Sequence, residues 1–437
     1  MRRSIHPSEH AVIKMAATYS EGLPGYSDSS TLPRYVPAID RPLTLSVTVL
    51  LTGSTGNLGT YLLLNLLGDP RVNRVYTLDR AGTTAVIERQ SASFADKGLD
   101  PSILMSPKLV VLEGKAYAER LGQTEEVYAN LLDEVSIIIH AAWRLNWNAG
   151  LDAFDPNIRA TRALVDFARK ARHADNLRFI FTSSIGSAHS WDAAARGPVP
   201  EELIEDPAVC IGGNGYGQSK YVAERVLGAS GIAFSSVRIG QASGGMPRGA
   251  WNTSAWFPTL VKLSLQLGVL PSDEQPVAWL PMDVVAHIMA DLMFSKTPLP
   301  PSLNVAHPRP IPWSQMIKYV RVSLKRSTHR DLRIIPFHGW MLRLEAAALQ
   351  SSVDTRDSAS LRLWLRDTKL FWFFRQVSTG DAFGRRFATA KAESLSETLR
   401  NVRSLKQRDA DAWVDYWAKR GLFRSEKESN SPLNSRL

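Results

Sequence analysis

A glycine-rich stretch that directly follows an apolar run constrains the fold of this 437-residue chain more than any other feature. Residues 45–51 are apolar and partly β-branched, which predicts a buried strand, and residues 60–67 are typical of an apolar helix. Between them, Thr52–Gly59 carries the spacing Gly-x-x-Gly-x-x-Gly. Such a turn lets a pyrophosphate approach the backbone at the N-terminus of the helix. We therefore expect a dinucleotide site formed by Gly53, Thr55, Gly56, Asn57, Leu58 and Gly59.

Segments typical of strands and helices alternate after this turn. Further strands are expected at 74–78, 108–112, 135–140, 177–181 and 233–239, and helices at 157–171 and 216–228. Strands that are apolar along their whole length, with helices between them, are typical of a parallel sheet covered on both faces. The predicted fold class is α/β, a doubly wound parallel sheet of the Rossmann type. A smaller, mainly helical C-terminal substrate subdomain is expected to follow it.

The sequence predicts four parts along the chain. Residues 1–44 are rich in Ser, Pro and Tyr, and we expect a mostly irregular N-terminal extension with one short helix near Val12–Tyr19. We expect residues 45–245 to form the cofactor-binding core and 246–424 the substrate-binding part. Within the latter, 277–307 is expected to return to the core sheet through short strands at 277–281 and 304–306. The Ser- and Asn-rich end, 425–437, predicts a disordered tail.

The composition excludes several classes of protein. A formal net charge of +10 favours acidic partners, but basic and aromatic residues do not alternate as on a nucleic-acid surface, so we expect no nucleic acid. The single cysteine, Cys210, can form no intramolecular disulfide and lies in no metal-ligand cluster, so we expect no metal. No stretch approaches the ~18 apolar residues that span a bilayer, and no secretory signal is recognisable. We therefore expect a cytoplasmic protein without a transmembrane segment.

Three polar side chains suggest proton transfer beside the dinucleotide. Tyr216 and Lys220 lie four residues apart, so on a helix both side chains project from one face. An unperturbed tyrosine has a pKa of about 10 and donates poorly at neutral pH, and a lysine one turn away would lower that pKa. Ser184 ends the strand that begins at residue 177 and would hydrogen-bond a substrate carbonyl. We predict that Tyr216 donates the proton, and that Lys220 also holds the cofactor ribose.

Two neighbouring side chains favour different dinucleotides. Asp79 lies 20 residues after Gly59, where an acid would hydrogen-bond the ribose hydroxyls of NAD. Arg80 follows at once, and an arginine there would pair with the additional phosphate of NADP. Alternatively, Asp79 is a turn residue and Arg80 folds over the adenine. The residues alone leave this choice open.

Other polar and small residues follow the strand at 135–140. Ala141 and Ala142 are small enough for the nicotinamide or its ribose to lie against the backbone, whereas His140 is expected to be structural. Asn157 opens the next helix, where it either orders a water molecule that returns protons to the lysine or only caps the helix.

These motifs together resemble a known family. The chain is similar to the extended short-chain dehydrogenases and, within them, to the thioester reductase domains of fungal nonribosomal-peptide-synthetase-like enzymes and carboxylic acid reductases. The resemblance covers about residues 46 to 424. It is carried by the glycine turn, by Phe181–Ser187 and by Gly215–Leu227. More specific are the runs Arg238-Ile239-Gly240-Gln241, Trp251-Asn252 and Trp256-Phe257-Pro258.

The resemblance implies an activity and its partners. Such domains use NADPH to release an acyl group, held as a phosphopantetheine thioester on a carrier domain, as an aldehyde or further as the alcohol, in secondary metabolism. By matched position Ser184, Tyr216 and Lys220 are catalytic, and Arg80, Ala141 and Ala142 join the glycines, Tyr216 and Lys220 in binding NADP(H). Substrate contacts are expected from Trp143, Ser184, Ile185, Gln241, Trp251 and Trp256. Relatives of this type imply a monomer.

The sequence departs from the family at two positions. Asp79 stands where the family has an apolar residue, so NAD(H) is not excluded, and Gly114-Lys115 replaces a Gly-Asp pair that helps to recognise adenine. Two other functions remain open. The first is reduction of a free aldehyde or ketone on the same scaffold, and the second is a non-catalytic NADP-binding protein. The chain is expected either to act alone on a separate carrier or to be a piece of a larger synthase.

Overall fold

The chain forms two compact units, each assembled from separated stretches. The computed structural model describes residues 6–37, 46–350, 369–378 and 386–423. Unit 1 comprises residues 1–242, 282–308 and 385–402, and unit 2 comprises residues 243–281, 309–384 and 403–437. The predicted disordered tail lies outside the described residues, and the assignment of cofactor and substrate binding to 45–245 and 246–424 stays a prediction.

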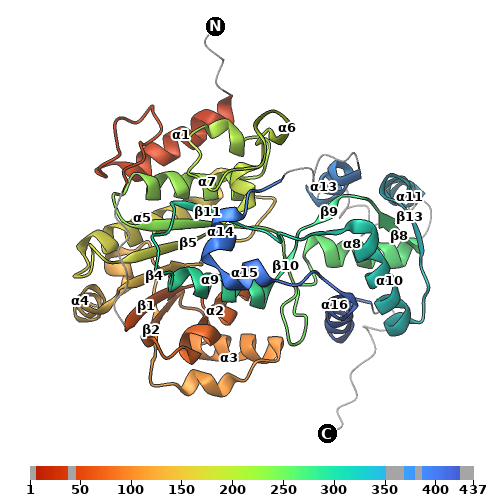
Figure 1. Cartoon of the computed structure of the whole chain (residues 1–437), viewed down its shortest axis with the longest axis horizontal. Helices are drawn as coiled ribbons and strands as arrows, with labels where there is room; N and C mark the ends of the chain where they lie inside the picture. The colour runs from red at the N-terminus through yellow and green to blue at the C-terminus, as the bar shows by residue number, and fades with distance from the viewer. Residues whose placement is uncertain (1–5, 38–45, 351–368, 379–385, 424–437) are drawn as a thin grey trace. The chain divides into compact units, whose positions relative to one another are not determined.

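Unit 1 is built on a seven-stranded sheet (Figure 1). Every neighbouring pair of its strands is parallel. In spatial order the strands are β11 (Ser302–Val305), β6 (Phe234–Ile239), β5 (Arg178–Ser184), β4 (Ile137–His140), β1 (Val47–Thr52), β2 (Val72–Asp79) and β3 (Leu109–Glu113). The predicted doubly wound parallel sheet is confirmed.

Helices cover both faces of this sheet (Figure 1). One face carries α5 (Asp155–Lys170) and α7 (Gly215–Gly228), and the other carries α2 (Asn57–Gly68) and α9 (Met282–Met293). The strands are therefore buried on both sides, which explains why β4 and β5 contain no exposed residue. The strand order reverses between β1 and β4, and ligands of such sheets bind outside the carboxyl ends of the strands at this switch point.

Several predicted boundaries hold to within a few residues, but one predicted return to the sheet is not found. The segment Val277–Pro281 does not return to the sheet: β9 (Pro276–Val277) pairs with β12 (Ile311–Pro312), and β10 (Leu280–Pro281) also lies outside it. Proline lacks the N–H that an interior strand must donate. By contrast, the strand predicted at 304–306 is found as β11, the edge strand beside β6.

The N-terminal segment is more ordered than predicted. Helix α1 spans Pro7–Ser20, begins with Pro7 and buries Val12, Ala16 and Ala17 completely. It packs against α7 and α5. The sequence also missed three longer helices of unit 1, namely α3 (Val86–Lys97), α4 (Glu125–Glu134) and α9. The remaining short helices of this unit are η1 (Pro101–Met105), η2 (Glu119–Gly122), η3 (Leu151–Phe154), η4 (Ile185–Ala188), α6 (Ala193–Arg196), η5 (Pro207–Cys210), α14 (Ala390–Leu395) and α15 (Glu397–Asn401).

Unit 2 is mainly helical, with a core of aromatic side chains. Among its described residues the helices are α8 (Trp256–Leu267), α10 (Trp313–Thr328), α11 (Phe337–Gln350), α13 (Lys369–Ser378) and α16 (Gln407–Lys419). Strand β8 (Val269–Ser272) pairs in parallel with β13 (Arg333–Pro336). Trp313, Trp413 and Trp417 are almost fully buried. The indole N–H of Trp413 donates to Gly244 O (3.1 Å) and that of Trp417 to Trp251 O (3.2 Å), so α16 is fixed to the loop before α8.

Candidate active site

The glycine turn forms an open helix N-terminus at the end of β1. A Cβ atom on Gly59 would lie 1.9 Å from Gly53 O, so only glycine allows the turn to close so tightly. Helix α2 begins after Gly56, which offers no side-chain cap to the first backbone N–H groups. Ala142 N donates to Thr52 Oγ1 (3.1 Å), which holds the segment after β4 against the end of β1. The predicted glycine, Ala141 and Ala142 positions are thereby brought together, and they fit a dinucleotide pyrophosphate.

Asp79 serves the glycine turn itself. Its carboxylate accepts hydrogen bonds from Ser54 Oγ (2.5 Å) and Thr55 Oγ1 (3.3 Å), and its side chain is 6% exposed. Burial raises the pKa of Asp79, although these hydrogen bonds act to lower it. Of the alternatives that the sequence left open, this geometry favours the turn residue.

Two arginines lie at the carboxyl end of β2, next to Asp79, whose carboxylate is already bound by Ser54 and Thr55. Arg80 is exposed, and its guanidinium forms no hydrogen bond or ion pair with the described residues. Arg89 is half-buried on α3 and donates from Nη2 to the backbone carbonyl of Arg80. Its Nε is buried without a hydrogen-bond partner among the residues that the structure describes. No sequence pattern singled out Arg89, although it lies on the helix after β2 and contacts the backbone of Arg80.

Tyr216 and Ser184 meet where α7 packs on the turn after β5. A Cβ atom on Gly217 would lie 2.4 Å from Gly186 O, so the absence of a side chain there lets the first turn of α7 approach η4 closely. Ser184 ends β5 and accepts at Oγ from Gly186 N (3.1 Å). Burial raises the pKa of Tyr216 to about 12, while a hydrogen bond with Ser184 acts to lower it. The Tyr216 hydroxyl therefore keeps its proton at neutral pH and lies next to Ser184. The predicted lowering of the Tyr216 pKa by Lys220 is not found, because burial raises that pKa instead.

Lys220 is buried one helical turn after Tyr216. Its side chain is 2% exposed, and Nζ donates to Thr182 O (2.6 Å) and lies 3.9 Å from the ring centroid of Trp143. Loss of water around the ammonium holds the pKa of Lys220 well below its usual range, and Glu224 opposes that shift. Trp143, predicted to contact substrate, packs over this lysine and donates to Ser219 Oγ (3.1 Å).

His140 occupies a structural position, and Asn157 lies within the first turn of α5. The ring of His140 is fully buried between Thr52 Oγ1 (2.8 Å) and Thr161 Oγ1 (3.2 Å). Burial and the charge of Lys220 lower the pKa of His140 to about 3, so the ring is neutral. Asn157 is not the cap of its helix, because α5 starts at Asp155 after Phe154. Its predicted role in a water relay stays a prediction.

The other residues predicted to contact substrate are divided between the two units. Ile185 follows Ser184 and is half-buried, and Gln241 Nε2 donates to Ala242 O (2.6 Å). Trp251 and Trp256 belong to unit 2. Trp251 is 4% exposed and packs on Trp413 with ring centroids 5.2 Å apart. The contact of these residues with a substrate stays a prediction.

An exposed aromatic side chain that no sequence pattern had singled out lies against Tyr216. Trp147 is 55% exposed, and its ring centroid is 5.1 Å from that of Tyr216. It lies in the loop between β4 and η3, where Leu145 is 69% exposed. Large apolar groups that stay in water beside a reactive hydroxyl are suited to contact an apolar ligand.

The described residues contain neither a metal cluster nor a membrane span. Among them, no group of three or more His, Cys, Asp or Glu side chains is placed to hold a metal ion. In the same part of the chain, no helix is long and apolar enough to cross a bilayer.

Comparison with known proteins identifies the family. Residues 51–289 match the family described as male sterility protein. The chain belongs to this family. It is an NAD(P)-dependent oxidoreductase, and the predicted resemblance to reductase domains is confirmed.

Its curated relatives are longer proteins. The chain is 42% identical to the adenylate-forming reductase Nps11 of Serpula lacrymans var. lacrymans over 93% of this chain and 37% of the relative. It is 29% identical to a carboxylic acid reductase of Neurospora crassa over 84% of this chain and 35% of the relative. This member of the male sterility family therefore spans little more than a third of the length of these relatives.

Solved structures share the fold. The terminal R domain of the myxalamid PKS-NRPS pathway matches with a TM-score of 0.73 at 21% identity, covering 95% of this chain and 99% of that one. A thiolation-reductase di-domain of an archaeal non-ribosomal peptide synthetase matches with a TM-score of 0.67 at 16% identity, covering 97% of this chain and 82% of that one. At these identities the likeness shows the fold alone.

Proposed function

We propose that this chain uses NADPH to reduce an acyl thioester, presented on the phosphopantetheine arm of a carrier domain, to an aldehyde. The observation that carries the proposal is the cluster of Ser184, Tyr216 and Lys220 at the carboxyl edge of the sheet, beside the glycine turn. The names of the relatives, adenylate-forming reductase and carboxylic acid reductase, support reduction of an activated carboxylic acid. The likeness to a thiolation-reductase di-domain supports a carrier partner.

Arg80 and Arg89 support NADPH as the cofactor. When bound, NADPH supplies the hydride. Arg80 is exposed at the end of β2, and the Nη2 of Arg89 binds the backbone carbonyl of Arg80, so the Arg89 guanidinium lies at the backbone of Arg80. Two cations suit a phosphate, which arginine binds through charge-assisted hydrogen bonds. The carboxylate of Asp79 is occupied by Ser54 and Thr55 and is therefore not offered to a ribose.

The hydroxyl groups of Ser184 and Tyr216 are assigned to the substrate carbonyl. As the carbonyl carbon gains a hydride, its oxygen becomes negative, and two O–H donors stabilise that charge. Lys220 Nζ lies 5.7 Å from the centroid of the Tyr216 ring, and in its protonated form it would favour proton release from Tyr216. The C–S bond then breaks, the carbonyl reforms as an aldehyde, and the thiolate takes up one proton. The net reaction converts a thioester, NADPH and a proton into an aldehyde, a thiol and NADP+.

The carrier is expected to approach through charge. The net charge of +10 suits an acidic partner that bears a phosphate, because such complementarity accelerates encounter. We expect the chain to act as a monomer.

The test is NADPH oxidation with an acyl-pantetheine thioester, with NADH and a free aldehyde in parallel. Tyr216→Phe should lower kcat by about 10²–10⁴-fold, which is typical of losing a general acid. Tyr221→Phe is the matched control, because Tyr221 lies on the same helix but its hydroxyl donates to Glu205 O (2.8 Å). Turnover of aldehydes but of no thioester would instead support a free-aldehyde reductase. Dinucleotide binding without turnover of either substrate would support a non-catalytic NADP-binding protein.

A further inference from the structure

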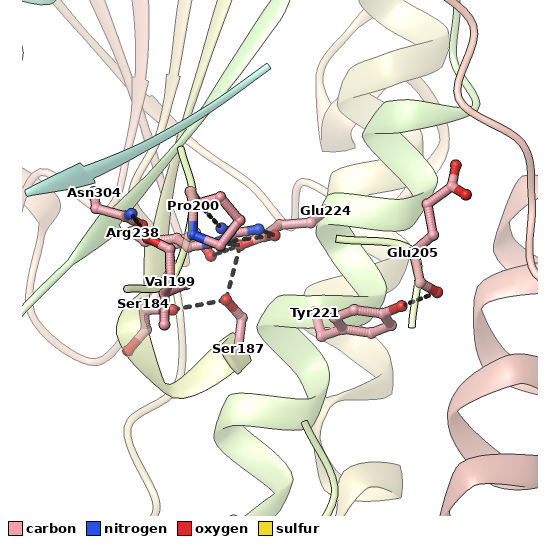
Figure 2. Close-up of polar contacts among 10 residues, drawn as sticks. Ser184, Ser187, Val199, Pro200, Glu205, Tyr221, Glu224, Arg238 and Asn304 are labelled. Carbon is pink, nitrogen blue, oxygen red and sulfur yellow. Dashed lines mark hydrogen bonds and ion pairs between the residues drawn. The ribbon is translucent and has the colours of Figure 1, made fainter. Parts of the chain in front are cut away.

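A buried ion pair lies behind the serines at the end of β5. Arg238 on β6 and Glu224 on α7 are 0% and 1% exposed, and Nη2 lies 2.6 Å from Oε2 (Figure 2). Arg238 Nε donates to Glu224 Oε1 (3.1 Å), so the pair is bidentate, and Nη1 reaches Pro200 O (3.3 Å). Removing two charges from water costs several kcal/mol, so such a pair is weak support for stability alone. Its other contacts suggest a further role.

Two serine hydroxyls also contact the carboxylate of Glu224. Ser183 Oγ donates to Glu224 Oε1 (2.5 Å). Ser187 Oγ lies 3.0 Å from the same oxygen (Figure 2). Ser183 is also the register partner of Arg238 across β5 and β6. Glu224 Oε1 therefore accepts from Arg238 Nε and Ser183 Oγ, and it shares the single hydroxyl proton of Ser187 with Ser184 O, so the ion pair contacts both serines.

These two serines flank Ser184 on either side. Ser183 precedes it in β5, and Ser187 Oγ donates to Ser184 O (2.8 Å) across the turn η4. The Ser184 hydroxyl is held in turn by Gly186 N (3.1 Å) within the same turn. The backbone before Ser184 and the carbonyl of Ser184 itself are thus both tied to one carboxylate.

Glu224 itself does not reach the reacting groups. It lies two helical turns after Tyr216 and one after Lys220, and its described partners are Arg238, Ser183 and Ser187. Its hydrogen bonds therefore act on catalysis through Ser184, while its charge also opposes the lowering of the Lys220 pKa; the serine variants keep that charge and so report on the hydrogen bonds.

We propose that Glu224, held by Arg238, is a positioning residue that fixes Ser184 opposite Tyr216 through Ser183 and Ser187. The kinetic part of this inference rests on the proposed function, because it takes Ser184 to bind the substrate carbonyl. A displacement of about 1 Å at such a group is enough to slow a reaction by about 100-fold.

The test first removes the serine hydroxyls while keeping the ion pair, and then removes the charge of Glu224. Ser187→Ala should lower kcat about three- to tenfold with KM for NADPH unchanged, since one net hydrogen bond of about 0.5–1.5 kcal/mol is lost. Ser183→Ala should act alike, and Glu224→Gln should have a larger effect. If Glu224→Gln does not fold, the kinetics of Ser183→Ala and Ser187→Ala alone decide the question. Tyr221→Phe is the matched control: it removes one hydrogen bond of the same helix, at a side chain 1% exposed, without touching the serines (Figure 2).

A double-variant comparison separates positioning from general stability. If Ser187 acts through Ser184, adding Ser187→Ala to Ser184→Ala should cost no further activity. Equal losses in both backgrounds would overturn the inference, as would a fall in melting temperature with kcat unchanged. Any carbonyl substrate that the wild type reduces serves in this comparison.

Amide hydrogen exchange gives a reading that needs no substrate. Exchange across Ile185–Ala188 should be faster in Ser187→Ala and Glu224→Gln than in wild type, and unchanged in Tyr221→Phe, because η4 loses its anchor. Unaltered exchange in both site variants would contradict the inference. If the wild type turns over no thioester, the proposed function is wrong, but this exchange measurement still tests the positioning role.

Discussion

Replacement of Arg80 by alanine should change the choice of cofactor without affecting stability. The side chain is exposed and has no hydrogen-bond or ion-pair partner in the described part of the chain, so its removal breaks no contact within it. Asp79, by contrast, is 6% exposed and holds Ser54 and Thr55. The two neighbours should therefore give different phenotypes.

The magnitude follows from one charge-assisted hydrogen bond to a phosphate. Such a bond contributes about 1.5–3 kcal/mol, which corresponds to about a 10- to 150-fold rise in the dissociation constant for NADPH, since about 1.4 kcal/mol is a factor of ten. Arg80 is exposed, and charges in solvent are screened over about 8 Å at physiological salt, so we expect the lower half of this range. Affinity for NADH, which lacks the phosphate, should not change.

Fluorescence titration of purified protein with each dinucleotide measures both constants and needs no substrate. Asp79→Asn is the contrasting variant: it disturbs the glycine turn and should weaken NADPH and NADH alike. The reasoning is refuted if Arg80→Ala weakens both cofactors equally, or if its effect on NADPH is independent of salt.

Three further predictions concern pH, substrate affinity and stability. Burial gives His140 a pKa of about 3 in the folded chain against an ordinary value of 6.5, so on acidification the unfolded chain binds the proton first. The free energy of unfolding should therefore fall below pH ~6.5, by up to about 1.4 kcal/mol per pH unit, and urea titrations at pH 7 and 5 should show a smaller loss for His140→Gln. Trp147→Ala should raise KM for an apolar acyl thioester about three- to tenfold with an unchanged melting temperature, because the ring is 55% exposed; an unchanged KM would remove Trp147 from the site. Trp251→Ala should cost about 3–5 kcal/mol of unfolding free energy, since the ring is 4% exposed, and an effect on KM alone would contradict this.

The sheet and the glycine turn were predictable because their signals are local. A strand buried on both faces must be apolar throughout, as Ile137–His140 is apart from its last residue, and a tight turn needs glycine at fixed spacing. Helix α3 escaped prediction because it buries Gln90 and Lys97 beside Val86 and Phe94, so its inner face is not apolar. Helix periodicity cannot be recognised where polar residues are buried in this way.

Contacts between residues far apart in the sequence explain which parts of the site could not be predicted. The bond between Ser54 and Asp79 joins residues 25 positions apart, and the bond between Ser183 and Glu224 joins residues 41 apart. Tyr216, Lys220 and Glu224 share one helix face at a spacing of four, which could have pointed to Glu224. Its pairing with Arg238 depends on the order of the strands, which no local pattern encodes.

The interrupted order of unit 1 along the chain has a consequence for its synthesis. The carboxylate of Glu201 accepts from the backbone N–H groups of Lys391 (2.6 Å) and Ala392 (2.9 Å), at the start of α14. At about 5–20 residues per second, Glu201 leaves the ribosome roughly ten seconds or more before those donors exist. The edge of β6 likewise stays unpaired until β11 has been synthesised, and an unpaired strand edge can pair with a wrong strand. The nascent chain must therefore pass through a stage with unsatisfied groups at this edge, and a protein cut before Lys391 would be an unfinished unit 1 rather than a smaller enzyme.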